Sequence, residues 1–138
     1  MSTIEKQEQI KIMFDHLSSS ERYERIILLG KDLLPLSPVH KTDENLVPGC
    51  QSRLYLHSEF KDGKVFFQAD ADALISKGLA ALLIKIYNGE SPETILTRPP
   101  IVLQEVGIIA SLSPTRSNGL QNLYLKMKQV ALYFLTQP

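Results

Sequence analysis

The sequence contains a single cysteine, Cys50, among 138 residues. One thiol excludes an internal disulfide, a CxxC redox pair and any structural zinc site that needs two or more thiolates. The sequence also lacks a phosphate-binding loop and a dinucleotide fingerprint. We therefore predict no bound metal and no cofactor, and any chemistry of the thiol is that of a solitary sulfur atom.

Charge of one sign and long apolar runs are missing as well. Fifteen Lys and Arg residues balance fifteen Asp and Glu residues, which argues against nucleic-acid and anionic-membrane partners. No apolar segment approaches the roughly 18 residues of a membrane-spanning helix, and the first residues do not follow the pattern of a secretory signal. We expect a cytoplasmic protein that folds as one domain over residues 1–138.

Helical periodicity marks both ends of the chain. Residues 3–17 carry apolar side chains at helical spacing, and Ser18 with Glu21 forms a capping box for a second helix whose buried face includes Tyr23 and Ile26. A long C-terminal helix is predicted after Ser113 and is expected to pack across the sheet. The ends of the chain are therefore expected to be helical.

The middle of the chain predicts a hairpin. Residues 36–49 read as a polar surface loop, and alternation of apolar and polar residues from Cys50 onward predicts a strand. Asp62 and Gly63 supply a turn, and residues 65–69 return as the second strand. The predicted fold class is α+β, with a small antiparallel β-sheet packed against several helices.

Two features of the second half of the chain are predicted from shorter patterns. Asp70 or Asp72 is expected to cap the helix that follows the hairpin, because a carboxylate accepts the free amides of a first turn. Residues 101–112 are ambiguous between helix and strand, with helix favoured.

Cys50 lies where the loop meets the predicted strand, directly after Gly49. A nucleophilic thiol needs a nearby cation such as Arg116, whereas a buried thiol is inert. An unbulged strand would point Cys50 and His57 to opposite faces, which argues against a Cys-His dyad. From the residues alone, Cys50 can be either a reactive or a structural thiol. A reactive thiol would suit a one-cysteine thiol enzyme (a peroxidase or an acyl transferase), and a structural thiol would suit a noncatalytic interaction module.

Three motifs in this order resemble the SufE family of sulfur acceptor proteins. The first is the stretch Val47-Pro48-Gly49-Cys50-Gln51-Ser52. The second is Asp70-Ala71-Asp72 with Lys77-Gly78 after it, and the third is Leu112-Ser113-Pro114-Thr115-Arg116-Ser117-Asn118-Gly119-Leu120. Together the motifs extend over most of the chain, and the resemblance implies a SufE/IscU-like fold.

The resemblance also implies a function. Cys50 would take sulfane sulfur from a PLP-dependent cysteine desulfurase of the SufS type, stimulate that enzyme, and pass the sulfur to a SufBCD-like iron-sulfur scaffold. Such a protein is an accessory carrier more than a stand-alone enzyme, and self-association into a homodimer stays open. Gly49, Gln51 and Ser52 would shape the Cys50 loop. Arg116 would lie near that loop, and Asp72 would influence the contact with the desulfurase.

Overall fold

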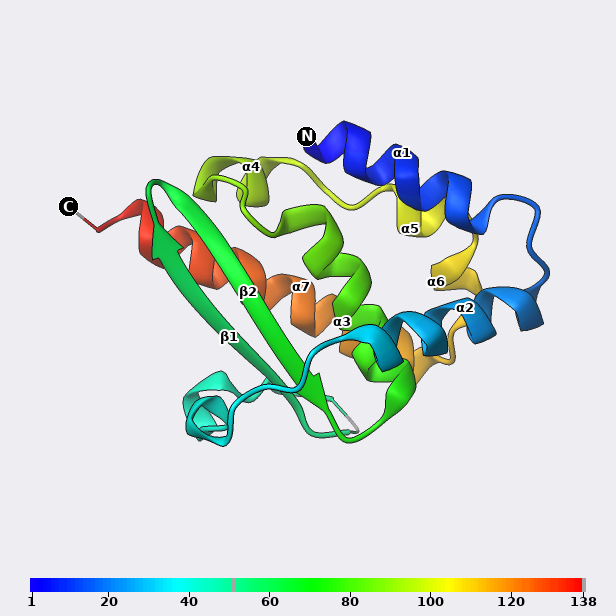
Figure 1. Ribbon diagram of the computed structural model, residues 1–138, viewed down its shortest axis with the longest axis horizontal. Helices are drawn as coiled ribbons and strands as arrows, with labels where there is room; N and C mark the ends of the chain where they lie inside the picture. Colours follow the sequence, from blue (N-terminus) through cyan, green and yellow to red (C-terminus); the bar gives the residue numbers. More distant parts are fainter. Residues whose placement is uncertain (51, 138) are drawn as a thin grey trace.

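The computed structural model describes residues 1–50 and 52–137. Over these residues the chain forms seven α-helices, two 3-10 helices and a two-stranded antiparallel sheet, which confirms the expected α+β class (Figure 1). The helices are α1 (Thr3–Phe14), α2 (Ser19–Asp32), η1 (Pro38–His40), η2 (Asp43–Asn45), α3 (Leu74–Tyr87), α4 (Pro92–Thr97), α5 (Val102–Glu105), α6 (Ile108–Ser111) and α7 (Pro114–Leu135). The strands are β1 (Leu54–Lys61) and β2 (Lys64–Ala71).

The hairpin forms around the predicted turn. Asp62 and Gly63 have φ angles of 54° and 77°, the left-handed conformation that a two-residue turn needs to match the twist of its strands. The register runs from Leu54 opposite Ala71 to Lys61 opposite Lys64. One face of this hairpin is apolar and buried, and its residues are Leu54, Leu56, Val65, Phe67 and Ala69.

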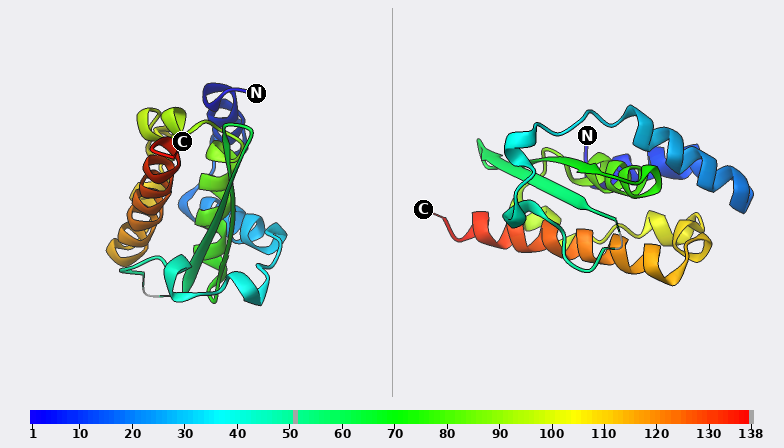
Figure 2. Two further views of the ribbon diagram at one scale, coloured as in Figure 1. Left: turned by 90° about the vertical axis from the view of Figure 1, so that its left-hand side faces the viewer. Right: turned by 90° about the horizontal axis from the view of Figure 1, so that it is seen from below.

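Helix α3 is the central element of the fold. It contacts α1, α2, α7 and β2, and the views in Figures 1 and 2 show it between the N-terminal helices and α7. Helix α7 contacts β1, as expected, and the Phe134 ring stacks on that of Phe60 with centroids 5.0 Å apart. One hydrophobic core therefore joins the hairpin to helices from both ends of the chain.

Two glycines let α2 and α3 pack closely. A Cβ atom on Gly78 would lie 2.0 Å from the Ile26 carbonyl oxygen, and one on Gly30 would lie 2.5 Å from the Leu74 carbonyl oxygen. Carbon and oxygen cannot approach so closely without moving the backbone. The contact between these helices thus depends on the absence of both side chains.

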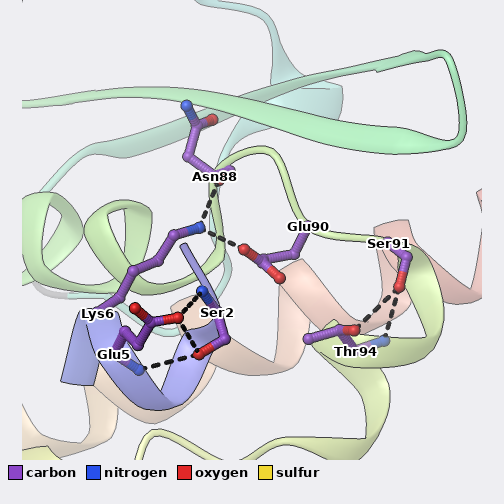
Figure 3. A network of polar contacts seen from close by, with 7 residues as sticks. All are labelled: Ser2, Glu5, Lys6, Asn88, Glu90, Ser91 and Thr94. Atoms are coloured by element: carbon purple, nitrogen blue, oxygen red, sulfur yellow. Dashed lines mark hydrogen bonds and ion pairs between the residues drawn. The ribbon is translucent and has the colours of Figure 1, made fainter. Parts of the chain in front are cut away.

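Helix α1 is fastened at its start to the turn that follows α3 (Figure 3). The Ser2 hydroxyl accepts a hydrogen bond from the Glu5 amide at 3.1 Å, and the Glu5 carboxylate accepts one from the Ser2 amide at 3.1 Å. This reciprocal box satisfies amides that a helix start leaves free. Lys6 Nζ donates to the Asn88 carbonyl oxygen at 3.1 Å and pairs with Glu90. The N-terminal helix is therefore held by polar as well as apolar contacts.

The predicted capping box at α2 is confirmed, but one residue of its expected buried face is not buried. Ser18 and Glu21 exchange both hydrogen bonds of the box, at 3.2 and 2.9 Å. Ile26 is buried, whereas Tyr23 is 49% exposed. Tyr23 therefore lies beyond the edge of the stripe that α2 turns toward α3. The ambiguous stretch from 101 to 112 contains the short helices α5 and α6, as favoured.

Neither aspartate caps α3, so that expectation was wrong. The N-cap residue of α3 is Ala73, whose side chain makes no cap hydrogen bond. Asp70 instead lies within β2, where its side chain is 9% exposed. Its carboxylate accepts hydrogen bonds from the amides of Leu36 at 3.1 Å and Ala71 at 2.9 Å. It therefore fastens the segment after α2 to the hairpin.

Two lysines complete the surroundings of Asp70. Lys41 Nζ lies 3.2 Å and Lys77 Nζ 3.3 Å from its carboxylate oxygens. Burial by itself raises the pKa of this carboxyl, but the hydrogen bonds from Leu36, Lys41, Ala71 and Lys77 outweigh burial and bring the pKa below its ordinary value. The ionised form is therefore the one that the folded protein stabilises.

We expect Asp70→Asn to lower the free energy of unfolding at pH 7 by about 2 kcal/mol, because the amide leaves two lysines without a counter-charge. A carboxyl whose pKa is lower in the folded state stabilises the protein above its unfolded pKa of about 4, and that stabilisation is lost as the pH falls further. The variant should therefore lose less stability on acidification than the wild type. Urea unfolding followed by circular dichroism at pH 7 and pH 3 measures both effects.

Asp62→Asn is the matched control, because Asp62 lies in the exposed hairpin turn and asparagine accepts its left-handed conformation. The control should stay within about 0.5 kcal/mol of the wild type. If the Asp70→Asn protein is as stable as this control at pH 7, the buried carboxylate makes no net contribution to the free energy of unfolding.

Candidate functional site

Cys50 lies in a loop that is closed at its base. The Val47 amide donates to the Leu54 carbonyl oxygen at 2.8 Å, and Leu46 forms an isolated bridge with Tyr55. The side chain of Val47 is buried. Strand β1 begins at Leu54, so Cys50 precedes the strand, whereas the sequence predicted that it opens the strand. The thiol is thus presented by a short loop with both ends attached to the sheet.

Gly49 and Asp72 shape this loop from its two sides. Gly49 has a φ of 75°, and a Cβ atom there would lie 2.5 Å from the Asn122 side-chain nitrogen. The Asp72 carboxylate accepts a hydrogen bond from the Arg53 amide at 3.0 Å, and the Asp72 amide donates to the Arg53 carbonyl oxygen at 3.1 Å. Asp72 therefore fixes the position of Arg53, the residue that precedes β1, through two hydrogen bonds.

The thiol of Cys50 is half-buried against α7. Its sulfur lies 3.8 Å from the Gly119 carbonyl oxygen, and a Cβ atom on Gly119 would be 3.6 Å away from it. Beside the sulfur is a cavity of about 20 Å³, which is room for about one small molecule the size of water. The cavity is lined by Cys50, Ser52, Leu54, Ser76, Leu79, Thr115, Arg116, Gly119, Leu120 and Leu123.

Two opposing effects act on the thiol. Burial raises the pKa of Cys50 above its ordinary value, because a thiolate is poorly solvated among apolar side chains. The positive charge of Arg116 partly opposes this rise. At neutral pH the resting thiol is thus mainly protonated, and a protonated thiol is a weak nucleophile.

A hydrogen-bonded chain of three side chains runs along one wall of the cavity. Arg116 Nη1 donates to the Ser76 hydroxyl at 3.0 Å, and the hydroxyl oxygens of Ser76 and Ser52 are 2.7 Å apart. The three residues come from α7, α3 and the Cys50 loop. The chain therefore links the loop to both helices behind it.

The structure brings most of the predicted site residues together. Cys50, Ser52 and Arg116 line one cavity, Gly49 lies next to the thiol, and Asp72 holds the end of the loop through Arg53. Gln51, also predicted to shape the loop, lies outside the described residues.

Sequence reasoning missed Ser76 and Gly119. Ser76 is a buried polar residue in an otherwise apolar face of α3, and a serine between Ile75 and Leu79 was the visible signal. Gly119 lies inside α7, one turn after Arg116. A glycine within a long helix often marks a close approach, here that of the Cys50 sulfur.

The histidine nearest in sequence to the thiol is engaged elsewhere. The His57 ring stacks on that of His40 with centroids 3.6 Å apart, and its Nε2 atom lies 3.7 Å from a Glu59 oxygen. His57 alternates with Leu54 and Leu56, which point into the core. Cys50 precedes β1, so the alternation of strand faces does not apply to it. The contacts of His57 with His40 and Glu59 nevertheless argue against a Cys50–His57 dyad.

The described part of the chain has neither a cluster of metal-binding side chains nor a membrane-spanning helix. Within residues 1–50 and 52–137, no three His, Cys, Asp or Glu side chains are grouped so as to hold a metal ion. Over the same residues, no helix combines the length and the apolar character that crossing a membrane requires.

Comparison with known proteins places these features in a family context. The model of the SufE family, described as an Fe-S metabolism associated domain, matches residues 8–131. An uncharacterized SufE-like protein of Synechocystis sp. is 39% identical over 119 residues, which are 86% of this chain and 75% of that protein. An uncharacterized SufE-like protein of Rhizobium meliloti is 33% identical, over 80% of this chain and 83% of its own length.

A longer relative and a solved structure are also similar. SufE-like protein 1 of Arabidopsis thaliana, described as chloroplastic/mitochondrial, is 38% identical over 128 residues, which are 92% of this chain but only 34% of that protein. The solution structure of a hypothetical protein from Thermus thermophilus superposes with a TM-score of 0.79 at 26% identity, covering 96% of this chain and 97% of that one.

Proposed function

The chain belongs to the SufE family, and from this premise we propose that it accepts sulfane sulfur on Cys50 from a cysteine desulfurase and carries it toward iron-sulfur cluster assembly. The observation that carries this proposal is the placement of one thiol in a short closed loop, with its sulfur beside a cavity of about 20 Å³. A carrier needs one thiol that is protected between encounters and becomes nucleophilic when a partner exposes it, and the burial of Cys50 supports the first of these properties.

The transfer is a thiol exchange. The Cys50 sulfur loses its proton and attacks the terminal sulfur of a persulfide on the desulfurase, and the partner's sulfur–sulfur bond breaks. The partner cysteine leaves with the bonding electrons and takes up a proton, so that Cys50 ends as a persulfide and the enzyme ends as a thiol. No external oxidant or reductant is needed, and removal of the persulfide frees the desulfurase for another cycle.

Burial of the resting thiol supports a gated carrier. A buried, mainly protonated thiol reacts slowly with oxidants, and a persulfide in the same cavity is shielded in the same way. The loop is attached to the sheet at Val47 and Leu54 and clamped at Arg53 by Asp72. We propose that docking of the desulfurase near Asp72 moves the loop tip outward and exposes Cys50, while Gly49 supplies the conformational freedom of the tip.

Composition separates this role from that of a cluster scaffold. Iron-sulfur clusters are held by several thiolates, and the sequence has one cysteine. On the strength of its membership of the SufE family, and not of its composition, we propose a PLP-dependent desulfurase of the SufS type as the donor and a scaffold complex of the SufBCD type as the recipient. The location of these partners would decide the compartment, for which we propose the cytoplasm.

Intact-mass spectrometry tests the proposal directly. The protein is incubated with a cognate desulfurase, PLP and cysteine, and then weighed under nonreducing conditions. We expect one additional sulfur atom per chain, confined to the peptide that contains Cys50, and faster cysteine turnover by the desulfurase. Rapid peroxide consumption without the desulfurase, together with no added sulfur, would favour the one-cysteine peroxidase instead.

A further inference from the structure

The chain of Arg116, Ser76 and Ser52 has a defined direction at its start. A guanidinium group only donates hydrogen bonds, so the Ser76 oxygen accepts the bond from Arg116 at 3.0 Å. A hydroxyl that accepts from a cation becomes a stronger donor, which favours donation from Ser76 to the Ser52 oxygen at 2.7 Å. The hydrogen of Ser52 is then free to point elsewhere.

The hydroxyl hydrogen of Ser52 can be donated into the cavity beside Cys50. Ser52 and Cys50 both line it, and four of its other lining residues are leucines. Our proposed function puts a persulfide on Cys50, and the terminal sulfur of a persulfide carries negative charge once its proton is lost. Burial of an anion among apolar side chains is costly unless a donor is hydrogen-bonded to it.

We propose that Ser76 is a positioning residue that holds Arg116 and Ser52 at the cavity, so that the Ser52 hydroxyl donates a hydrogen bond to the terminal sulfur of the Cys50 persulfide. This inference rests on the proposed function, which supplies the persulfide. Ser76 lines the same cavity, but its hydroxyl is engaged with Arg116 and Ser52, so it acts on the persulfide through these two residues. It is 8% exposed in α3, a rigid element, and so fixes both neighbours from behind the loop.

Loss of the Ser76 hydroxyl has two consequences. Ser52 loses its partner and is free to rotate, and the Arg116 guanidinium loses an acceptor beside a largely apolar wall. The guanidinium then turns toward water, because a donor left unpaired against leucine is destabilised. Both changes weaken the electrostatic stabilisation of a negative charge on the sulfur, whether it is the thiolate of Cys50 or the terminal sulfur of the persulfide.

The test compares Ser76→Ala, Ser52→Ala and the wild type. Each protein is loaded with inorganic polysulfide, which adds sulfur to a thiol without a desulfurase, and the lifetime of the persulfide against a small thiol is followed by intact mass. We expect both variants to lose the added sulfur about tenfold to a hundredfold faster, the effect of one hydrogen bond to a charged group. The double variant should be little worse than either single variant, since one chain is broken in each case.

The pH profile of alkylation of the unloaded protein is the second readout. Ser76→Ala should move the profile to higher pH, because Arg116 no longer favours the thiolate, whereas a change in access alone would alter only the plateau rate. Ser58→Ala, a serine on β1 that lines a different hollow next to α7, is the matched control and should behave as the wild type in both assays.

An unchanged persulfide lifetime and an unchanged pH profile in Ser76→Ala would overturn the positioning role. If Ser76→Ala does not fold, Ser52→Ala decides: a wild-type persulfide lifetime in that variant overturns the hydrogen bond to the terminal sulfur. Failure of the proposed function looks different, since the wild type would then accept no sulfur from a desulfurase, while the shift of the alkylation profile would still occur.

Discussion

Cys50→Ser is expected to abolish sulfur acceptance and to return the desulfurase to its basal rate. A serine hydroxyl is close in size to a thiol, but it is far less acidic and does not attack a sulfur atom under these conditions. Since the sequence has no other cysteine, no second residue can take its place. We expect transfer to fall by at least about a hundredfold, measured as radiolabelled sulfur retained by the protein and as sulfide or alanine production by the desulfurase.

The variant should keep its fold and its affinity for the desulfurase. The thiol is half-buried and contributes one weak contact, at 3.8 Å, to the Gly119 carbonyl oxygen. Thermal unfolding and a pull-down with the desulfurase check these two properties. Cys50→Ala serves as the companion variant, because it removes the hydroxyl as well. Full stimulation of the desulfurase by both variants would mean that the protein acts by docking alone, as an interaction module.

Gly78→Ala is expected to be the most destabilising small substitution in the fold. The new methyl group would lie 2.0 Å from the Ile26 carbonyl oxygen and 2.6 Å from Ile26 Cγ2. Neither neighbour is the free end of a flexible side chain, so α2 has to move away from α3. We expect a loss of about 3 kcal/mol or more in the free energy of unfolding and a fall in Tm of roughly 10 °C, measured by urea and thermal unfolding.

Gly119→Ala is the matched control, because it makes the same change inside another helix. Its methyl group would meet the Cys50 sulfur at 3.6 Å, an ordinary van der Waals distance. Alanine is also the better helix former by about 1 kcal/mol, so this variant should be as stable as the wild type or more so. Equal stability of the Gly78→Ala and Gly119→Ala proteins would contradict the close packing of α2 on α3.

Local sequence patterns were sufficient to predict the structural elements that depend only on residues close to one another in the sequence. The box of Ser18 and Glu21 and the turn at Asp62 and Gly63 depend on residues within a few positions of one another, and both occur as predicted. The Cys50 loop is in part of the same kind, because glycine before it and alternation after it indicate a loop that enters a strand, although the strand begins at Leu54 and not at Cys50 as predicted. These features could be read without knowledge of the rest of the fold.

Features that depend on distant residues could not be read in this way. Asp70 has the local pattern of a helix cap, but its partners include the Leu36 amide and Lys41, which precede it by about thirty residues. The role of Ser76 likewise depends on residues from α7 and the Cys50 loop that only the fold brings to α3. Tertiary contacts outweighed local preference at both positions.

The base of the Cys50 loop also limits how far the cargo can travel. A chain of the length between Val47 and Leu54, extended at about 3.5 Å per residue and doubled back on itself, has a reach of roughly 12 Å. As long as the 2.8 Å hydrogen bond between Val47 and Leu54 persists, the loop acts as a tether that limits the Cys50 sulfur to roughly this distance from the edge of the sheet. If the protein carries sulfur as we propose, the reactive cysteine of a donor or recipient must cover the remaining distance. The tether therefore favours partners whose reactive cysteine lies on a protruding segment over partners in which it is deeply recessed.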